Sequence, residues 1–307
     1  MDLSQLITKI IIFLFLIFVG YFCSRKGIVT AEFTTQASKL VVNVFGSASI
    51  INAVASCQDI SVSPGEVLSV FFIMFGITAV SYVFGFAIIK ILRLKGEKAL
   101  NIELLTAMMN ILFVGVPIVQ EIIGGLSVLY LGIACIPFNF LMYTYCVWRI
   151  VGNGVHKVSV KDIISIPMVA ALIAMVLVIL RIKLPAPVAI LSDTISGATV
   201  PMSMIVIGTS LGKTTLKEAF CDLGVYLVCF LRLIVFPVLT WLILRPIGMD
   251  RTIMASSVIT AGCPCAVMVS ALMIQYGKDA EFASKTILVS TVLSMATLPL
   301  LSLMLGL

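Results

Sequence analysis

Two proline-containing motifs interrupt long apolar stretches of the chain, one in each half. The first is Asn110–Pro117, which ends in a Gly-x-Pro triplet, and the second is Gly262–Cys265, which begins with one. Proline has no N–H and clashes with the preceding helical turn, so a helix must kink or break there. In hydrocarbon, a broken helix is tolerated only where protein buries it or where it lines a wet cavity. Interrupted spans at corresponding places in two halves indicate a transporter site.

The chemistry of a broken helix depends on which of its ends faces the ligand. Half-helix N-termini present free N–H groups and a partial positive charge, which suit an anion, whereas C-termini and unwound carbonyls suit a cation. We expect two N-termini to meet near the bilayer midplane, with an amide donating to a carboxylate oxygen. The alternative is a structural kink with close helix packing at glycine. The substrate-binding residues predicted at the breaks are Asn110, Gly115, Pro117, Cys263, Pro264 and Cys265.

A soft-metal transport site is a second interpretation of the Cys263–Cys265 triplet. Thiolates favour Cu(I), and copper-pumping ATPases carry Cys-Pro-Cys in a membrane helix. Those pumps also have large cytosolic ATP-handling domains, and this sequence shows neither such a domain nor a Gly-rich phosphate loop. One histidine, His156, does not support a zinc site or a catalytic triad. We therefore expect no bound metal and no cofactor, and we treat the two cysteines as small residues beside the break.

Charged residues inside apolar stretches are expensive and suggest function. Arg232, in VCFLRLIVFPVL, stands well inside its stretch, where snorkelling to the surface is awkward. It either holds an anionic substrate or pairs structurally with an acid or a carbonyl. Glu121 and Glu103 are both candidate proton-coupling carboxylates, although the interpretation that we favour for Glu103 is a solvated end residue.

An amide and a group of small polar residues occur together in an earlier apolar stretch. Asn43 is followed by Gly46-Ser47-Ala48-Ser49. Small residues of this kind allow close helix packing, which is the structural explanation. The functional explanation is a cavity wall that offers an amide and hydroxyl groups. We expect Asn43 and Ser47 to line the substrate cavity.

The composition is that of a polytopic membrane protein. Of the 307 residues, 61% are hydrophobic and 11% are charged, against about 45–50% apolar and about 25% charged in soluble domains. The net charge of +6 fits the positive-inside pattern better than nucleic-acid binding. The eight cysteines lie mostly in apolar runs, which argues against a secreted disulfide framework. The first apolar run precedes its basic pair, the reverse of a signal peptide, so we expect an uncleaved first span.

Span length and charge predict the topology. At about 20 apolar residues per crossing, the chain fits about ten spans. Fourteen of the 20 Lys and Arg fall near one side of these spans and five near the other. The richer side should be cytoplasmic, which places both termini outside. The expected spans are 4–23, 38–57, 67–90, 99–123, 127–149, 163–181, 187–211, 219–243, 252–275 and 281–305.

The spans divide into two halves of five. We expect a first repeat at 1–151, a cytoplasmic linker at 152–162 and a second repeat at 163–307. Five is an odd number, so the second repeat enters the membrane with the opposite orientation. The fold class is therefore an all-α membrane protein with two inverted five-helix repeats, whose broken helices 4 and 9 cross.

Five segments of the sequence resemble the auxin efflux carrier family of membrane transporters, whose bacterial members include proteins named malate and malonate permeases. The likeness covers nearly the whole chain, and its most specific part is the C-terminal segment. The matching segments are GYFCSRKGIV at the end of span one, Asn110 to Pro117, Pro201 with Gly208, Arg232 to Pro237, and the closing YGKDAEFASKTILVSTVLSMATLPLLSLML.

The resemblance implies ten spans in two inverted repeats, a site at crossed helices four and nine, organic-anion substrates and a scaffold domain that often forms a homodimer. This sequence departs from the family at two places. Ser47 stands where the family usually has a proline, and Val267 and Met268 stand where it often has an asparagine. The second departure removes a polar contact and leaves the substrate's identity open.

The function that we predict is secondary transport of a small organic anion, such as a carboxylate, across the plasma membrane by alternating access. The driving force would be the membrane potential or a coupled proton or sodium ion. One alternative is a membrane sensor that binds a ligand at the same crossover without transporting it. An intramembrane enzyme is less favoured, because the sequence has no paired catalytic Asp on facing spans and no His-Glu-x-x-His motif, so we expect no catalytic residues.

Overall fold

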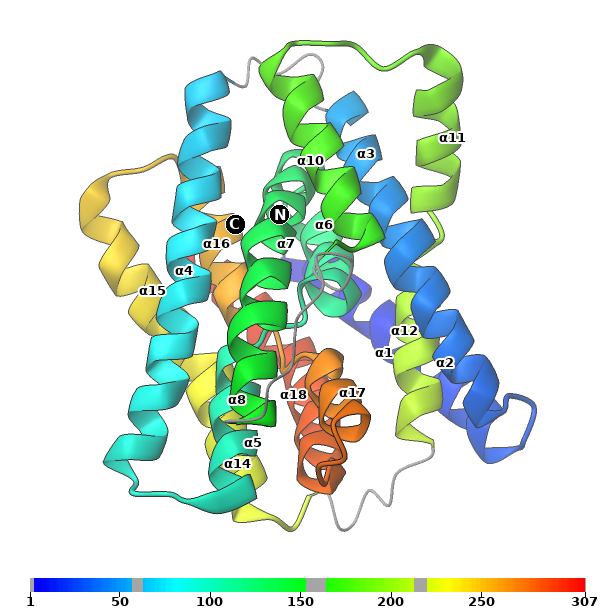
Figure 1. Ribbon diagram of the computed structural model, residues 1–307. Coiled ribbons are helices and arrows are strands. Elements are labelled where there is room, and N and C mark those ends of the chain that lie inside the picture. The colour runs from blue at the N-terminus through cyan, green and yellow to red at the C-terminus, as the bar shows by residue number, and fades with distance from the viewer. Residues whose placement is uncertain (1–2, 57–62, 153–163, 213–219, 307) are drawn as a thin grey trace.

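The computed structural model of the chain is a bundle of helices (Figure 1). It describes residues 3–56, 63–152, 164–212 and 220–306, and no strand occurs within these ranges. The predicted linker at 152–162 lies outside the described residues apart from its first residue, Gly152, and so does His156.

The first half of the chain forms long helices, some of which contain short π-helical turns, labelled η. In chain order its elements are α1 (Leu3–Arg25), α2 (Ala31–Leu40), η1 (Val41–Gly46), α3 (Ser47–Ser56), α4 (Pro64–Ile91), α5 (Gly96–Ala107), η2 (Ile111–Gly115), α6 (Val116–Ile122), α7 (Gly125–Leu141), η3 (Met142–Cys146) and α8 (Val147–Val151).

The second half repeats this pattern of long helices with local interruptions. Its described elements are α10 (Ile166–Ile179), α11 (Ala186–Ser196), α12 (Thr199–Leu211), α14 (Leu223–Phe230), η4 (Leu231–Val235), α15 (Phe236–Leu244), η5 (Arg245–Ile247, a 3₁₀ turn), α16 (Arg251–Gly262), α17 (Val267–Gln275) and α18 (Glu281–Met304).

Side-chain caps fix several helix starts. Ser63 accepts a hydrogen bond from the Glu66 N–H, and Pro64 occupies the first position of α4, where its missing N–H costs nothing. Ser165 and Asp250 cap α10 and α16 in the same way. Each cap satisfies a backbone donor that the helix itself leaves free.

Helices run through each of the ten predicted spans. Six helical segments of the described chain are long and apolar enough to cross a membrane, and they are Glu32–Ala55, Pro64–Ile91, Gly125–Val151, Ala186–Leu211, Leu223–Ile247 and Glu281–Met304. Shorter apolar helices lie at Ile11–Arg25, Ile111–Ile122 and Ile166–Ile179. The chain is therefore an all-helical, multi-pass membrane protein, and the number of ten crossings stays a prediction.

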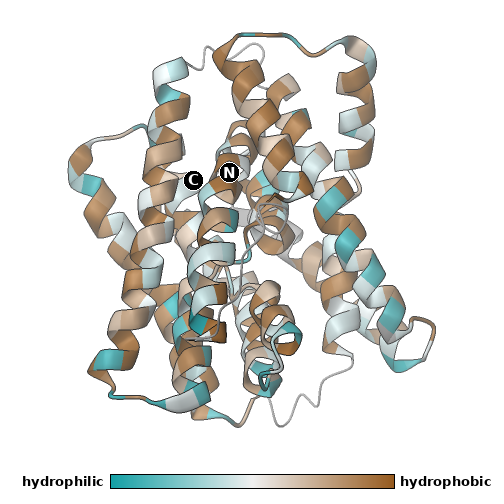
Figure 2. Ribbon diagram, in the orientation of Figure 1, coloured by the Kyte–Doolittle hydropathy of each residue, from teal (hydrophilic) through white to brown (hydrophobic). Residues whose placement is uncertain are grey.

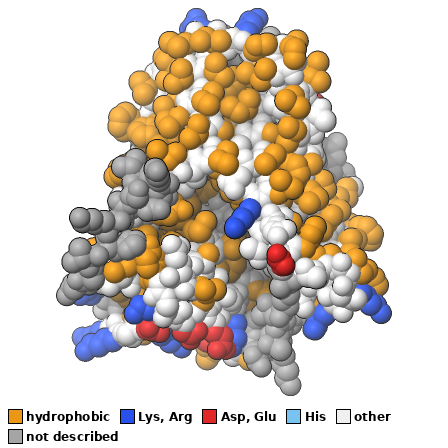
Figure 3. All heavy atoms as spheres, turned by 45° about the vertical axis from the view of Figure 1, so that its right-hand side comes forward, with side chains coloured by type: hydrophobic (Ala, Val, Ile, Leu, Met, Phe, Trp, Pro, Cys, Tyr) orange, Lys and Arg blue, Asp and Glu red, His pale blue; other side chains and the backbone are white. Residues whose placement is uncertain are grey.

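The surface agrees with this assignment. Brown, apolar positions dominate the middle of the helices, and teal positions gather toward the lower ends and along α2 (Figure 2). In the space-filling view, hydrophobic side chains gather over the upper part of the face, most charged side chains lie along its lower edge, and basic ones lie at its upper edge (Figure 3). A broad apolar surface between two charged ends is what a bilayer requires.

Glycines set the closest helix contacts. The helices α1 and α12 pack along each other, with Gly20 against the backbone of Ile205 and Gly208 against the backbone of Ile17. Lipid tails are as apolar as the helices, so helix association in a membrane depends on such close approach at small residues. Around the centre, α4 packs on α5 and α7, and α16 packs on α15 and α18.

Candidate functional site

Two helices break near the centre of the molecule. The helix α5 ends at Ala107 and the chain becomes helical again at Ile111, where η2 begins. The helix α16 ends at Gly262 and α17 begins at Val267. At the first break Met108 is extended, with φ −88° and ψ 128°, and at the second break Cys263 has φ −59° and ψ 145°.

The two breaks are bonded to each other through the main chain. The Asn110 N–H donates to the Pro264 carbonyl at 2.8 Å, and the Ala266 N–H donates to the Met108 carbonyl at 3.1 Å. Met109 and Cys265 form the antiparallel bridge between these two bonds. Backbone groups freed by a broken helix in hydrocarbon cost several kcal/mol each unless they are paired. Here each break supplies partners for the other, so the two interruptions depend on each other.

Pro117 lies beyond the first break, where the Gly-x-Pro motif predicts a kink or break at the proline itself. The break occurs at Met108–Asn110, and Pro117 sits in the helix that follows, directly after the π-helical turn η2. In η2 the Gly115 N–H donates to the Asn110 carbonyl five residues back. The wide turn lies close to the new helix start, where a proline is tolerated. The second motif behaves as predicted, because Pro264 lies inside its break.

Arg232 is hydrogen-bonded to the backbone at both breaks. Its guanidinium is fully buried, with Nε donating to the Cys263 carbonyl at 3.0 Å and Nη1 donating to the Thr106 carbonyl at 3.2 Å. The charge also lies over the Phe236 ring, 5.2 Å from its centroid. Of the two interpretations of Arg232, these contacts match the structural one, with carbonyls as partners. Among the described residues it forms no ion pair with a carboxylate.

A serine on a third helix pairs a backbone group of the second break, and no sequence pattern indicates this contact. The Ser290 hydroxyl on α18 accepts a hydrogen bond from the Cys265 N–H at 3.2 Å. Ser290 is one of several hydroxyl residues in α18, and only the position of the break shows which of them is used.

Two helix N-termini lie at the crossover, which is the place where the Asn110–Pro264 and Ala266–Met108 main-chain bonds join the two breaks. At the first, the Asn110 side chain caps η2, because its Oδ1 accepts from the Phe113 N–H at 3.3 Å. Its Nδ2 donates to no other described residue. At the second, α17 has no side-chain cap, and Val267 and Met268 in its first turn are exposed. N-terminal N–H groups and an amide donor are the groups that bind a carboxylate.

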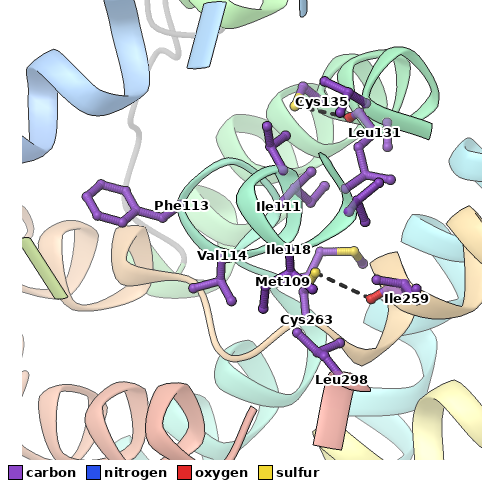
Figure 4. Packing of buried hydrophobic residues seen from close by; sticks show 14 of the residues in the cluster. Met109, Ile111, Phe113, Val114, Ile118, Leu131, Cys135, Ile259, Cys263 and Leu298 are labelled. Atoms are coloured by element: carbon purple, nitrogen blue, oxygen red, sulfur yellow. Dashed lines mark hydrogen bonds between the residues drawn. The ribbon is translucent and has the colours of Figure 1, made fainter. Parts of the chain in front are cut away.

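The two breaks also touch through their side chains. A methyl group on Gly115 would lie 2.8 Å from the Cys263 Sγ and 3.2 Å from the Leu131 side chain. Figure 4 shows Cys263 between Met109 and Leu298, with its thiol directed at the Ile259 carbonyl, 3.4 Å away. The side chains around Gly115 and Cys263 are therefore apolar and closely packed.

This contact gives a reciprocal test of the crossover. Gly115→Ala is expected to destabilise the protein by about 1–3 kcal/mol, because its methyl group overlaps the Cys263 thiol. Cys263→Ala removes the sulfur, so the double variant Gly115→Ala/Cys263→Ala should recover most of that loss. Thermal unfolding of the three purified variants measures the coupling. Purely additive effects would mean that the two breaks do not pack as described.

The other predicted site residues do not belong to the bridge itself. The turn η1, which carries Asn43, packs against η2. Asn43 is half-buried, and the Ser47 hydroxyl is buried without a partner among the described residues. Glu121 is half-buried near the far end of α6. The structure thus brings Asn110, Gly115 and the Cys263–Cys265 triplet together. It places Asn43 on the adjoining turn η1, Ser47 at the start of α3, and Glu121 near the far end of α6.

The interpretation of Glu103 as a solvated end residue is wrong. Its carboxylate is fully buried, and it accepts hydrogen bonds at Oε1 from the Arg149 Nε and the Tyr145 hydroxyl, both at 2.7 Å. A further contact joins the Arg149 Nη2 to Oε2. A carboxylate at this depth is tolerated because Arg149, near the end of α8, supplies a bidentate partner.

The thiols at the crossover do not form a metal site with other ligands. Within the described ranges, no group of three or more His, Cys, Asp and Glu side chains is placed to hold a metal ion. Cys263 and Cys265 are buried as free cysteines.

Comparison with known proteins identifies relatives that are membrane transporters by name. The chain matches the family described as "Membrane transport protein" over residues 5–156 and again over 149–302. It is 24% identical over 311 residues to an "Uncharacterized transporter" of Methanocaldococcus jannaschii, covering 95% of this chain and 96% of that protein. A similarly named protein of Methanothermobacter thermautotrophicus is 25% identical over 296 residues, with the same coverage of both chains.

A third relative shares a shorter region. A "Putative malonate transporter" of Rhizobium meliloti is 35% identical over 114 residues, which are 37% of this chain and 35% of that protein. The two family matches together span nearly the whole sequence. The resemblance found in the sequence is thereby confirmed, and the chain belongs to the membrane transport protein family.

Proposed function

We propose that this protein is a secondary transporter that carries a small organic anion across the plasma membrane. The observation that carries the proposal is the main-chain bridge between the two helix breaks, in a chain that belongs to a transporter family. Irregular backbone at membrane depth is the usual substrate site of such proteins. In alternating access, the helices around this crossover would move so that the substrate site faces first one side of the membrane and then the other.

The chemistry of the crossover favours an anion. Two helical segments begin there: η2, which continues into α6, and α17. The partial positive charges of their N-termini therefore lie close together. The buried guanidinium of Arg232 is bonded to the Thr106 and Cys263 carbonyls, and it offsets the partial negative charge of the two helix C-termini that lie at the same place. The Asn110 Nδ2 supplies a donor for a carboxylate oxygen. A relative named as a malonate transporter makes malonate the first substrate to test.

The membrane arrangement that we propose is ten spans in two inverted repeats, at 1–151 and 163–307, joined by a cytoplasmic linker at 152–162. The directions of the broken helices support it, because α5 leads to its break from one side and α16 from the other (Figure 1). The charge asymmetry places both termini outside. Membrane-impermeant labelling of a single cysteine in the linker, in intact cells, measures this orientation.

Uptake of radiolabelled malonate by proteoliposomes tests the proposed function, with malate as a second probe and an imposed membrane potential. Asn110→Ser separates two roles of this residue, since serine still caps the helix but lacks the amide donor. The loss of one hydrogen bond to a charged group is worth about 1.5–3 kcal/mol, so half-saturation should rise roughly ten- to a hundredfold.

Asn101→Ser is the matched control. Asn101 is also buried and lies on the same broken span, but its Nδ2 bonds to the Glu97 carbonyl within α5, a bond that serine can replace. Its half-saturation should stay at the parent value. Malonate binding without uptake would favour the sensor alternative, and equal affinity of Asn110→Ser and the parent would remove Asn110 from the site.

A further inference from the structure

Both carbonyls held by Arg232 stand at the C-terminal end of a half-helix. Thr106 is the last residue but one of α5, and Cys263 is the residue that caps α16. A helix C-terminus carries a partial negative charge on its unpaired carbonyls. The guanidinium therefore lies where two such ends meet, fully buried and bonded to one carbonyl from each.

This position has a known chemical use in transporters with broken helices. Unwound carbonyls and half-helix C-termini coordinate the coupling Na⁺ or H⁺, while N-termini face the anionic substrate. In this chain a side chain on a third element, η4, supplies the cation instead. Arginine stays protonated in proteins, and it cannot leave the site as an ion does.

We propose that Arg232 is a built-in counter-ion that occupies the cation position of the crossover, so that the transport cycle uses no metal cation there. The proposal concerns the same crossover as the proposed function and extends it to the coupling ion. It assigns Arg232 a positioning role, because its contacts are to the backbone of the two breaks.

The geometry of the guanidinium supports this role over simple core packing. Its planar fork reaches two carbonyls that lie on different spans, which a hydrated ammonium point charge does less well. The third nitrogen, Nη2, is buried and has no hydrogen-bond partner among the described residues. The Phe236 ring covers one face of the group and limits the access of water. The guanidinium charge therefore interacts with the C-terminal ends of α5 and α16.

Removal of the side chain should restore a cation site. Arg232→Ala leaves two carbonyls facing an empty space, and added guanidinium or Na⁺ can then bind where the side chain was. The test is thermal unfolding of purified protein in detergent, at constant ionic strength, in N-methylglucamine, sodium or low-millimolar guanidinium chloride. We expect guanidinium to raise the melting temperature of Arg232→Ala by on the order of 5 °C, with a smaller gain from sodium.

Two controls complete the test. The parent protein should melt at the same temperature in all three salts, and a sodium-specific gain there would overturn the proposal. Arg245→Ala is the matched control, since Arg245 is exposed and stacks on Trp241, so its removal creates no cation site. No gain for Arg232→Ala in guanidinium or sodium would also overturn it.

A second pair of variants keeps the test open if Arg232→Ala does not fold. Arg232→Lys keeps the positive charge, whereas Arg232→Met keeps only the length of the side chain. The lysine variant should therefore have the higher melting temperature. Equal melting temperatures would contradict a counter-ion role. None of these measurements needs a substrate, so they can succeed even if malonate uptake fails. In uptake assays, the parent should work equally well in sodium-free buffer.

Discussion

Arg149→Met is expected to lower the free energy of unfolding by about 3–5 kcal/mol, the usual cost of removing one partner of a buried ion pair. The change leaves the Glu103 carboxylate with no cation and no exposed surface. The Tyr145 hydroxyl is then its one remaining described partner. Methionine retains much of the packing of the arginine stem, so the effect should come from the charge.

The reverse change should cost less. Glu103→Gln leaves Arg149 unpaired, but 26% of the Arg149 side-chain surface is exposed, so its charge can reach water. The double variant Arg149→Met/Glu103→Leu removes both charges and should be more stable than Arg149→Met alone. Thermal or denaturant unfolding of the purified variants measures this order.

An exposed ion pair in the same region gives the control. Lys278 lies 3.6 Å from Glu97, and both side chains are substantially exposed. Lys278→Met should therefore cost at most about 1 kcal/mol. If Arg149→Met costs no more than this control, Glu103 is not held as the contacts indicate.

The helical segments could be predicted from the sequence because a membrane span is recognised from one stretch of consecutive residues. A run of about 20 apolar residues identifies itself without reference to any other part of the chain. All ten expected segments contain helix, and within the described residues six of them satisfy both length and hydropathy as single helical segments. Of the others, α10 is short, and the segments that contain α5 and α16 are interrupted, as at the break between Ala107 and Ile111.

The position of the first break could not be predicted in the same way. Pro117 shows that the helix is strained, but not which peptide groups leave it. Those groups belong to Met108–Asn110, and they are paired with the backbone of Pro264 and Ala266. That partner lies in the other half of the chain, so no local pattern records it. Pro264 gave the right position because it lies inside its own break.

The charged residues show the same limit. The place of Glu103 near the end of a span predicts a solvated side chain. Its carboxylate can be buried because Arg149, 46 residues later in the chain, pairs with it. For Arg232, burial could be predicted and the choice between carboxylate and carbonyl could not, because a carbonyl partner has no sequence signature. Contacts between backbone and distant side chains are a property of the fold.

Gly208→Ala is expected to lower the free energy of unfolding by more than Gly115→Ala does. A methyl group on Gly208 would collide with the Ile17 carbonyl, which belongs to the backbone and cannot move aside as a side chain does. Extra methylenes in a packed interior cost about 1–3 kcal/mol where side chains can adjust, so the loss here should be at or above 3 kcal/mol.

The arrangement is reciprocal, since a methyl group on Gly20 would collide with the Ile205 carbonyl in the same way. Gly20→Ala should therefore act like Gly208→Ala, and the double variant should cost less than the sum, because one separation of α1 from α12 relieves both collisions. Unfolding midpoints of the three variants provide the comparison.

Gly76→Ala separates this effect from the general consequence of replacing a helical glycine. Gly76 lies inside α4, and a methyl group there would meet nothing within 4 Å. Alanine should stabilise this helix by up to about 1 kcal/mol, through its higher helix propensity. The two substitutions are chemically identical and are expected to differ in sign. If Gly208→Ala is as stable as Gly76→Ala, then α1 and α12 do not approach each other closely, and glycine is not what joins these two helices in the membrane.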